Sequence, residues 1–194
     1  MFAQEYAELR WSWFGRYDQA PGIQPGDRII VSWDTALTAN ELSDYSAAVV
    51  LLVRRETAYV LDVVRARLEF PELRRKVLEL HDKWRYRCQN YALLIEDKGS
   101  GMSLLQDLRR DGFHPIGIKP IADKVMRMNA HTAKIEAGAV LLPRNAGWLE
   151  DFRGEILAFP KGRHNDQVDA LSQALDRAFS HRAPVAQMGY YSRR

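Results

Sequence analysis

The alternation of hydrophobic and polar positions places strands early in the chain and helices later. Residues 28–34 form a run rich in β-branched side chains and bounded by turn residues, which predicts a buried strand. Residues 45–53 and 57–64 repeat this pattern with only three residues between them, so we expect an antiparallel hairpin. The domain is therefore predicted to open with three strands, the later two antiparallel.

From Pro71 onward, hydrophobic residues recur at spacings of three and four, which is typical of an amphipathic helix. The elements predicted after it are a strand at 91–96, a helix at 102–108, a strand at 115–118, a helix at 126–137, a strand at 139–142, and helices at 148–157 and about 165–179. Because strands and helices alternate, we expect parallel strands joined by right-handed crossovers. The predicted fold class is α/β, a mixed β-sheet with helices on both faces.

The two ends of the chain differ from this middle part. Residues 1–27 crowd Trp11 and Trp13 beside other aromatic residues and end in a turn-rich run. We interpret them as a lead-in segment and linker, with the alternative that the aromatic residues cap the core. Residues 28–180 are then one domain, and residues 181–194 are a flexible tail.

Composition limits the class of protein. With 194 residues, 46% of them hydrophobic and 27% charged, the chain has enough apolar material for a globular domain with a real core. Its single cysteine, Cys88, excludes an internal disulfide and a multi-cysteine zinc site. No apolar run is long enough for a membrane span and no signal peptide is recognisable, so we expect a cytoplasmic protein.

The charge pattern permits a nucleic-acid partner without requiring one. The formal net charge is +3, and what matters for phosphate binding is where the cations gather. Residues 65–87 carry many arginines and lysines interleaved with acids. This run favours a solvated helix face, and a surface that follows phosphates is the alternative.

Carboxylates stand where chemistry is expected in such a fold. Asp34 and Glu96 end two apolar strands, and ligands collect at the carboxyl ends of strands in open α/β sheets. Asp166 and Asp169 are three residues apart, on the side of the last helix opposite its hydrophobic stripe. Taken singly, Asp34 could be a turn residue and Asp166 a partner of the helix dipole.

If three of these carboxylates converge, their hard oxygen atoms suit Mg²⁺ or Mn²⁺. A pair of such ions can activate a water and stabilise the leaving oxygen of a phosphodiester, which is nuclease chemistry. The nucleophile motif Gly-x-Ser-x-Gly and the phosphate-binding motif of ATPases are both missing from the sequence. His164, beside the acids, could hold a water or a phosphate, or be an ordinary surface residue.

Five short segments occur in the order of a known family. They are VSWDTA at 31–36, SDYS at 43–46, LIEDKGSG at 94–101, DKVMRM at 123–128 and HNDQVDAL at 164–171. Together they resemble the C-terminal nuclease domain of the large terminase subunit of tailed phages and prophages. The similarity extends from about residue 28 to residue 179 and implies a ribonuclease-H-like fold.

The resemblance also implies the site. Asp34, Glu96 and Asp166 match the metal-binding triad by position, and Asp169 lies close to them. The triad is expected to hold two Mg²⁺ or Mn²⁺ ions, with Asp34 between them. Asn165 stands where the family often has a second consecutive aspartate, which leaves Asp166 and Asp169 as alternatives for the third ligand.

Further expectations concern the surroundings of the triad and the partners. Asp44 and His164 are expected to support the triad, and DNA contacts are expected at Lys98, Lys119, Lys124 and Arg127. The implied function is a metal-dependent endonuclease that cuts double-stranded viral DNA during packaging in the bacterial cytoplasm. The implied partners are an N-terminal packaging ATPase that this chain lacks, the small terminase subunit and the portal, with no membrane.

Two other functions stay open. A junction resolvase would share the acids and prefer branched DNA. A catalytically silent DNA-binding or docking module would use the acids only to cap helices.

Overall fold

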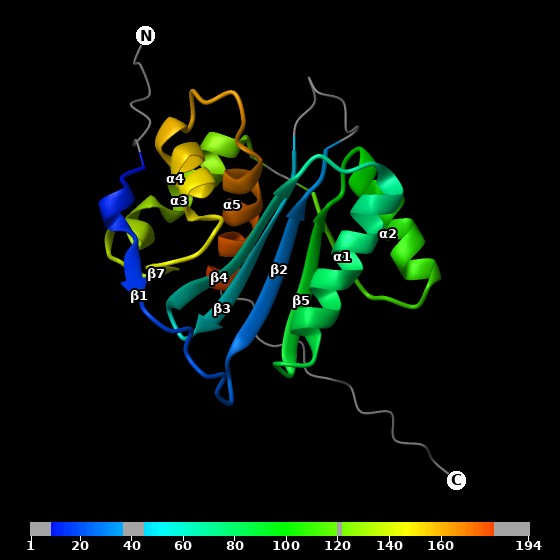
Figure 1. The fold of residues 1–194 in the computed structure, drawn as a ribbon, viewed down its shortest axis with the longest axis horizontal. Coiled ribbons are helices and arrows are strands. Elements are labelled where there is room, and N and C mark those ends of the chain that lie inside the picture. Colours follow the sequence, from blue (N-terminus) through cyan, green and yellow to red (C-terminus); the bar gives the residue numbers. More distant parts are fainter. Residues whose placement is uncertain (1–8, 37–44, 120–121, 181–194) are drawn as a thin grey trace.

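A computed structural model describes residues 9–36, 45–119 and 122–180 (Figure 1). Its strands form one sheet in the order β1-β7-β4-β3-β2-β5-β6. The strands are β1 (Gly15–Tyr17), β2 (Arg28–Asp34), β3 (Ser46–Arg54), β4 (Thr57–Ala66), β5 (Asn90–Glu96), β6 (Ile116–Ile118) and β7 (Val140–Pro143). β3 is antiparallel to both of its neighbours and every other pair is parallel, which confirms the predicted hairpin and mixed sheet.

Helices cover both faces of this sheet, as predicted. They are α1 (Phe70–Arg85), α2 (Ser100–Arg110), α3 (Lys124–Glu136), α4 (Leu149–Ala158) and α5 (Asp166–Phe179), with a short 3-10 helix at Trp11–Trp13. Figure 1 shows α1 and α2 on one face, and α3, α4 and α5 on the other. None of the described helices combines the length and the apolar character that crossing a membrane requires.

The strands alternate their side chains between two hydrophobic cores. In β2, Ile29 and Val31 pack toward α1 and α2, whereas Ile30 belongs to the core beneath α5. In β5, Leu93 packs toward α1 and α2, and Leu94 packs toward α5. Residues two apart in a strand share a face, so Asp34 in β2 and Glu96 in β5 lie on the face that α5 covers.

The segment before β2 takes part in the domain. Leu9 and Phe14 are buried in the core beneath α5, and Trp11 and Trp13 pack against it, so the aromatic residues cap the core. β1 extends the sheet by pairing with β7. The sequence did not predict β1, because three residues are too few to show a periodic pattern. The predicted tail at 181–194 lies outside the described residues.

The turn from β5 into α2 fixes the position of the strand end. A Cβ atom on Gly101 would lie 2.0 Å from the Glu96 carbonyl oxygen, so only glycine fits there. The Ser100 hydroxyl donates to the Ala36 carbonyl (2.6 Å) and lies 2.9 Å from the Thr35 hydroxyl. The start of α2 is thereby tied to the residues that directly follow β2.

Replacing Gly101 tests this close approach. We expect Gly101→Ala to lower the free energy of unfolding by about 2 kcal/mol, since the methyl group forces the first turn of α2 away from Glu96. Gly154→Ala, in α4 with open space at its Cβ, should instead raise stability by about 0.5–1 kcal/mol. Chemical denaturation measures both, and equal stabilities for the two variants would contradict the packing described.

Candidate metal centre

Asp34 and Glu96 lie side by side at the end of the sheet. β2 and β5 are parallel with Trp33 beside Ile95, so the next residues along, Asp34 and Glu96, are neighbours on strands about 4.8 Å apart. The Glu96 carboxyl group lies where it can hydrogen-bond with Asp34, an interaction that raises the pKa of Asp34. Such a bond needs one proton between two acids, because two ionised carboxylates only accept hydrogen bonds.

Helix α5 brings the other acids to the same place. It packs across β2 and β3, and Gln173 donates from Nε2 to Ser32 Oγ (2.9 Å) and to the Trp33 carbonyl (3.3 Å). Asp166, Asp169 and Gln173 share one side of the helix because they are three and four residues apart. That side is buried rather than solvated: Asp166 is 7% exposed and Gln173 is 3% exposed.

The electrostatics of the four acids show that they form one cluster. Burial raises the pKa of Asp34 well above its usual range, and its hydrogen bond with Glu96 and the charges of Glu96, Asp169 and Asp166 raise it further. Burial also raises the pKa of Asp169 to about 6, against the opposing effects of Arg127 and Lys124. The cluster therefore carries more negative charge than its surroundings balance.

Helix α3 supplies the nearest cations. Asp123 caps this helix, its Oδ1 accepting from the amides of Val125 (2.9 Å) and Met126 (3.0 Å). One turn on, Arg127 Nη2 donates to Asp169 Oδ1 at 2.9 Å, with the Arg127 side chain 11% exposed. Arg127, predicted as a DNA contact, thus lies inside the site as a counter-ion of Asp169.

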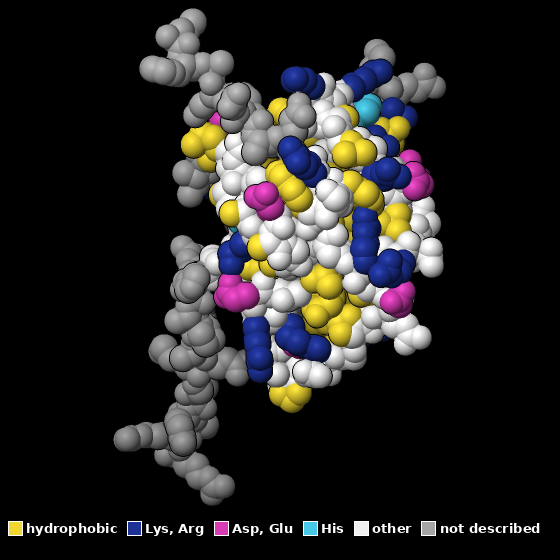
Figure 2. Space-filling model, turned by 90° about the vertical axis from the view of Figure 1, so that its left-hand side faces the viewer, with side chains coloured by type: hydrophobic (Ala, Val, Ile, Leu, Met, Phe, Trp, Pro, Cys, Tyr) yellow, Lys and Arg dark blue, Asp and Glu magenta, His cyan; other side chains and the backbone are white. Residues whose placement is uncertain are grey.

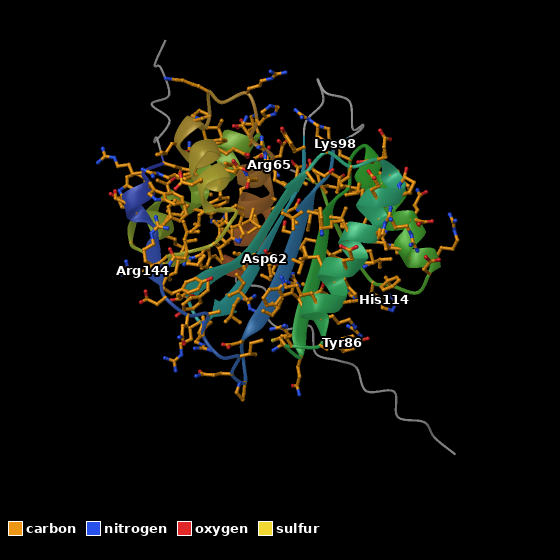
Figure 3. All side chains as sticks on the ribbon, viewed as in Figure 1. Asp62, Arg65, Tyr86, Lys98, His114 and Arg144 are labelled. Atoms are coloured by element: carbon orange, nitrogen blue, oxygen red, sulfur yellow. The ribbon has the colours of Figure 1, made fainter. Side chains whose placement is uncertain are left out.

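The remaining predicted residues lie around the cluster. Lys98 is exposed on the turn after Glu96, at the same end of the sheet as Arg65 (Figure 3). Lys119 is exposed and its Nζ lies 3.7 Å from Asp97 Oδ2. His164 Nδ1 lies 4.0 Å from Asp166 Oδ2. Asp44 lies outside the described residues.

A residue that sequence reasoning missed, Glu155, holds the start of α5. Its Oε1 accepts from the backbone amides of Gln167 (2.6 Å) and Val168 (3.1 Å), and its Oε2 accepts from the Gln167 side chain (2.8 Å). The residue before the helix, Asn165, makes no side-chain cap. Glu155 therefore caps from α4 the helix that carries Asp166 and Asp169.

The donor set suits a hard divalent cation. Carboxylate oxygens are the ligands that Mg²⁺ and Mn²⁺ prefer, and the uncompensated charge favours a cation over a neutral ligand. As the side chains stand, no group of three or more acids, histidines or cysteines in residues 9–36, 45–119 and 122–180 is arranged to hold an ion. Burial and the neighbouring acids favour the protonated form of Asp34, so an ion that binds there competes with this proton.

The mixed sheet and its cluster of acids at the strand ends define a ribonuclease-H-like α/β domain. The sequence matches the family described as the terminase RNaseH-like domain over residues 31–178, and the chain belongs to that family. No curated protein matches the chain.

Solved terminase structures share the fold. The large terminase of a thermophilic bacteriophage in complex with ADP superposes with a TM-score of 0.62 at 13% identity, over 88% of this chain and 44% of that one. The large terminase nuclease of the thermophilic phage G20c with bound magnesium gives 0.62 at 14% identity, over 84% and 92%. The human cytomegalovirus terminase nuclease domain, soaked with manganese and inhibitor bound, gives 0.56 at 9%, over 78% and 82%. The chain thus spans less than half of the ADP-bound large terminase.

The raised pKa values predict how stability depends on pH without a divalent ion. Between about pH 4 and pH 6 the folded protein keeps protons on Asp34 and Asp169 that the unfolded chain releases, so their contribution to stability falls as the pH rises, by about 2 kcal/mol for Asp169. Burial lowers the pKa of His81, which gives the opposite slope in the same range. The stability of the wild type is therefore compared with that of Asp34→Asn, which mimics the protonated acid and keeps His81.

We expect Asp34→Asn to be more stable than the wild type at pH 7.5 in EDTA and nearly equal to it at about pH 4.5. Mn²⁺ should raise the Tm of the wild type at pH 7.5 and leave that of the variant almost unchanged. Thermal unfolding measures both effects. A wild type more stable than Asp34→Asn at pH 7.5 in EDTA would show that the cluster is not electrostatically strained.

The cap that Glu155 provides for α5 should contribute both to the stability of the protein and to its affinity for Mn²⁺. Glu155→Ala leaves two buried amides without their acceptor and should lower the free energy of unfolding by about 2–3 kcal/mol, whereas Glu155→Gln keeps an acceptor oxygen and should lose less. Glu150→Ala, an exposed residue of the same helix, is the control. Measured under conditions in which all three variants are folded, the affinity for Mn²⁺ should fall for Glu155→Ala alone. Identical Mn²⁺ affinities in the three variants would show that Glu155 does not help to position the acids of α5.

Proposed function

We propose that this domain is a metal-dependent endonuclease that cuts double-stranded viral DNA during genome packaging in the cytoplasm of a bacterial host. The observation that carries the proposal is the convergence of Asp34, Glu96, Asp166 and Asp169 at one end of the sheet, in a chain of the terminase family. Buried acids with raised pKa values are favoured where a protein must bind a cation or move a proton.

We infer that Asp34 is the central ligand. Its carboxyl group meets Glu96 on the neighbouring strand, and the charges of Asp166 and Asp169 reach it from α5. We propose that Asp34, with Glu96 on one side and Asp166 on the other, would hold two Mg²⁺ or Mn²⁺ ions. Bound there, two such ions would activate a water and stabilise the leaving oxygen of the phosphodiester.

The protein's own groups have separate tasks in this proposal. Asp34 would hold an ion in its ionised form, so the apparent affinity for the ion would rise with pH. Arg127 neutralises Asp169 and thereby limits the repulsion that Asp166 feels along the same helix face. This ion pair favours Asp166 over Asp169 as the third ligand.

The structural relatives support the choice of ion and the larger context. One is a terminase nuclease with bound magnesium and another is one soaked with manganese. A third is a phage large terminase in complex with ADP, and this chain matches only 44% of it. We therefore propose that the domain works with an ATPase domain, a small terminase subunit and a portal, and that residues before β2 connect it to the ATPase.

Plasmid nicking in Mg²⁺ or Mn²⁺ tests the proposal. Asp34→Asn and Glu96→Gln should each reduce the rate at least about a hundredfold, since each removes a ligand of the ions. Asp166→Asn should cost more than Asp169→Asn. Asp97→Asn is the control and should retain activity, because Asp97 follows Glu96 in the chain but pairs with Lys119.

Three outcomes would overturn the proposal. Full cleavage by Asp34→Asn and Glu96→Gln would remove the acids from the reaction. Preference for a four-way junction over linear duplex would assign a junction resolvase instead. No cleavage, together with no Mn²⁺-dependent rise in Tm, would leave a silent DNA-binding module.

A further inference from the structure

The cations between Arg65 and Arg87 divide into two groups in the fold. Several of those on α1 have acidic partners: Arg74 with Asp107 and Asp111, Lys76 with Glu79, and Lys83 with Asp62. Arg65 is the last but one residue of β4, and Arg67 follows the strand. These two lie at the end of the sheet that carries the acid cluster.

The strand register places Arg65 on the same face as Asp34. Asp34 pairs with Ala47 of β3, and Ala47 pairs with Arg65 of β4, so Arg65 is two strand spacings, about 10 Å, from Asp34. Ala47 and Val63 belong to the core beneath α5, and residues two apart in a strand share a face. Figure 3 shows Arg65 at the end of the sheet that also carries Lys98.

Tyr45 holds the two guanidinium groups together. The Cζ atom of Arg65 lies 3.7 Å from the centre of the Tyr45 ring, and that of Arg67 lies 4.2 Å from it. The edge of the same ring meets His164, with ring centres 5.2 Å apart, and His164 directly precedes Asn165 at the start of α5. The stack is thereby connected to the loop beside Asp166.

The two arginines differ in what else they contact. Arg65 Nε lies 3.6 Å from Glu155 Oε2 and the side chain is 22% exposed, so Arg65 is partly committed to the cap of α5. Arg67 is exposed, and in the described part of the chain it forms no ion pair with a carboxylate. Two cations fixed 4.2 Å or less from one ring repel each other unless an anion lies between or beside them.

We propose that Arg65, Arg67 and Tyr45 form a binding surface for the phosphate backbone of double-stranded DNA next to the acid cluster. The inference rests on the proposed function, because it names where the substrate lies relative to the cluster. A guanidinium held by an aromatic ring is presented with its planar fork directed outward, which suits phosphate oxygens. Acids that must bind cations also repel DNA, so fixed cations beside them are needed to bring the backbone close.

The position of this surface is more specific than the overall charge. Figure 2 shows Lys and Arg side chains spread over the face on the left of Figure 1, with hydrophobic and acidic side chains between them. Such a scattered distribution defines no single path for a polyanion. The stacked pair beside Asp34 differs because its geometry is fixed and its place relative to the acids is defined.

Binding of a fluorescent linear duplex to the full chain in EDTA, measured by anisotropy over a range of NaCl concentrations, tests the surface without cleavage. Arg67→Ala should weaken binding about five- to tenfold and reduce the salt slope by about 1. Arg67→Lys should keep the slope and lose part of the affinity, and Tyr45→Ala should weaken binding more than Tyr45→Phe. Arg85→Ala is the matched control, since Arg85 lies 5.4 Å from the exposed ring of Tyr86, at the opposite end of the molecule (Figure 3).

Two results would overturn the proposal. One is an Arg67→Ala protein whose affinity and salt slope equal those of Arg85→Ala. The other is competition by polyglutamate as strong as that by unlabelled duplex, which would assign the surface to an acidic protein. Cleavage in Mn²⁺ is measured separately. If Arg67→Ala weakens DNA binding but the wild-type chain never cuts DNA, the surface is supported and the nuclease is rejected. If the wild-type chain cuts DNA but Arg67→Ala binds it normally, only the surface is rejected.

Discussion

The repulsion among four carboxylates confined at one end of the sheet is the constraint around which this domain is built. Asp34 and Glu96 are neighbours because two parallel strands end there in register, and α5 lays its first turn over the same point. Without a cation, the protein tolerates this arrangement by keeping protons, as the raised pKa values of Asp34 and Asp169 show. A cluster that is costly when ionised and empty is one that gains most from binding divalent ions.

Three charged side chains around the cluster have different effects on the acids. Arg127 lies inside and balances one acid directly. Glu155 lies behind the cluster and satisfies the amides at the start of α5, so this helix end is fixed from a neighbouring helix. Arg65 contacts both Glu155 and the ring of Tyr45, which connects the interior of the site to its surface. Positioning, neutralisation and access therefore depend on side chains from α3, α4 and β4 and on Tyr45, the residue before β3.

The sequence predicted the succession of strands and helices after residue 28 and the acids at the strand ends, because apolar runs bounded by turns and the terminal position of a residue are local signals. It could not predict that Arg127 faces Asp169, since that contact spans 42 residues and depends on how α3 packs on α5. Glu155 did leave a signal: it shares the buried face of α4 with Phe152 and Ile156, and a charged residue within a hydrophobic stripe needs a buried partner. The run at 65–87 was ambiguous because one stretch of sequence leads from the end of β4 into α1.

The two halves of the cluster differ in how they are anchored. β2 hydrogen-bonds to a strand on each side, so the backbone beneath Asp34 cannot shift without moving the whole sheet. The helix that bears Asp166 is joined to β2 by side chains rather than by a backbone ladder: Gln173 donates to Ser32, and Arg28 donates to the Ala178 carbonyl. Glu155 joins the same helix to α4. The distance between Asp34 and Glu96 is therefore set by the backbone of the sheet, whereas their distance to Asp166 and Asp169 depends on how the side chains of α5 pack against it.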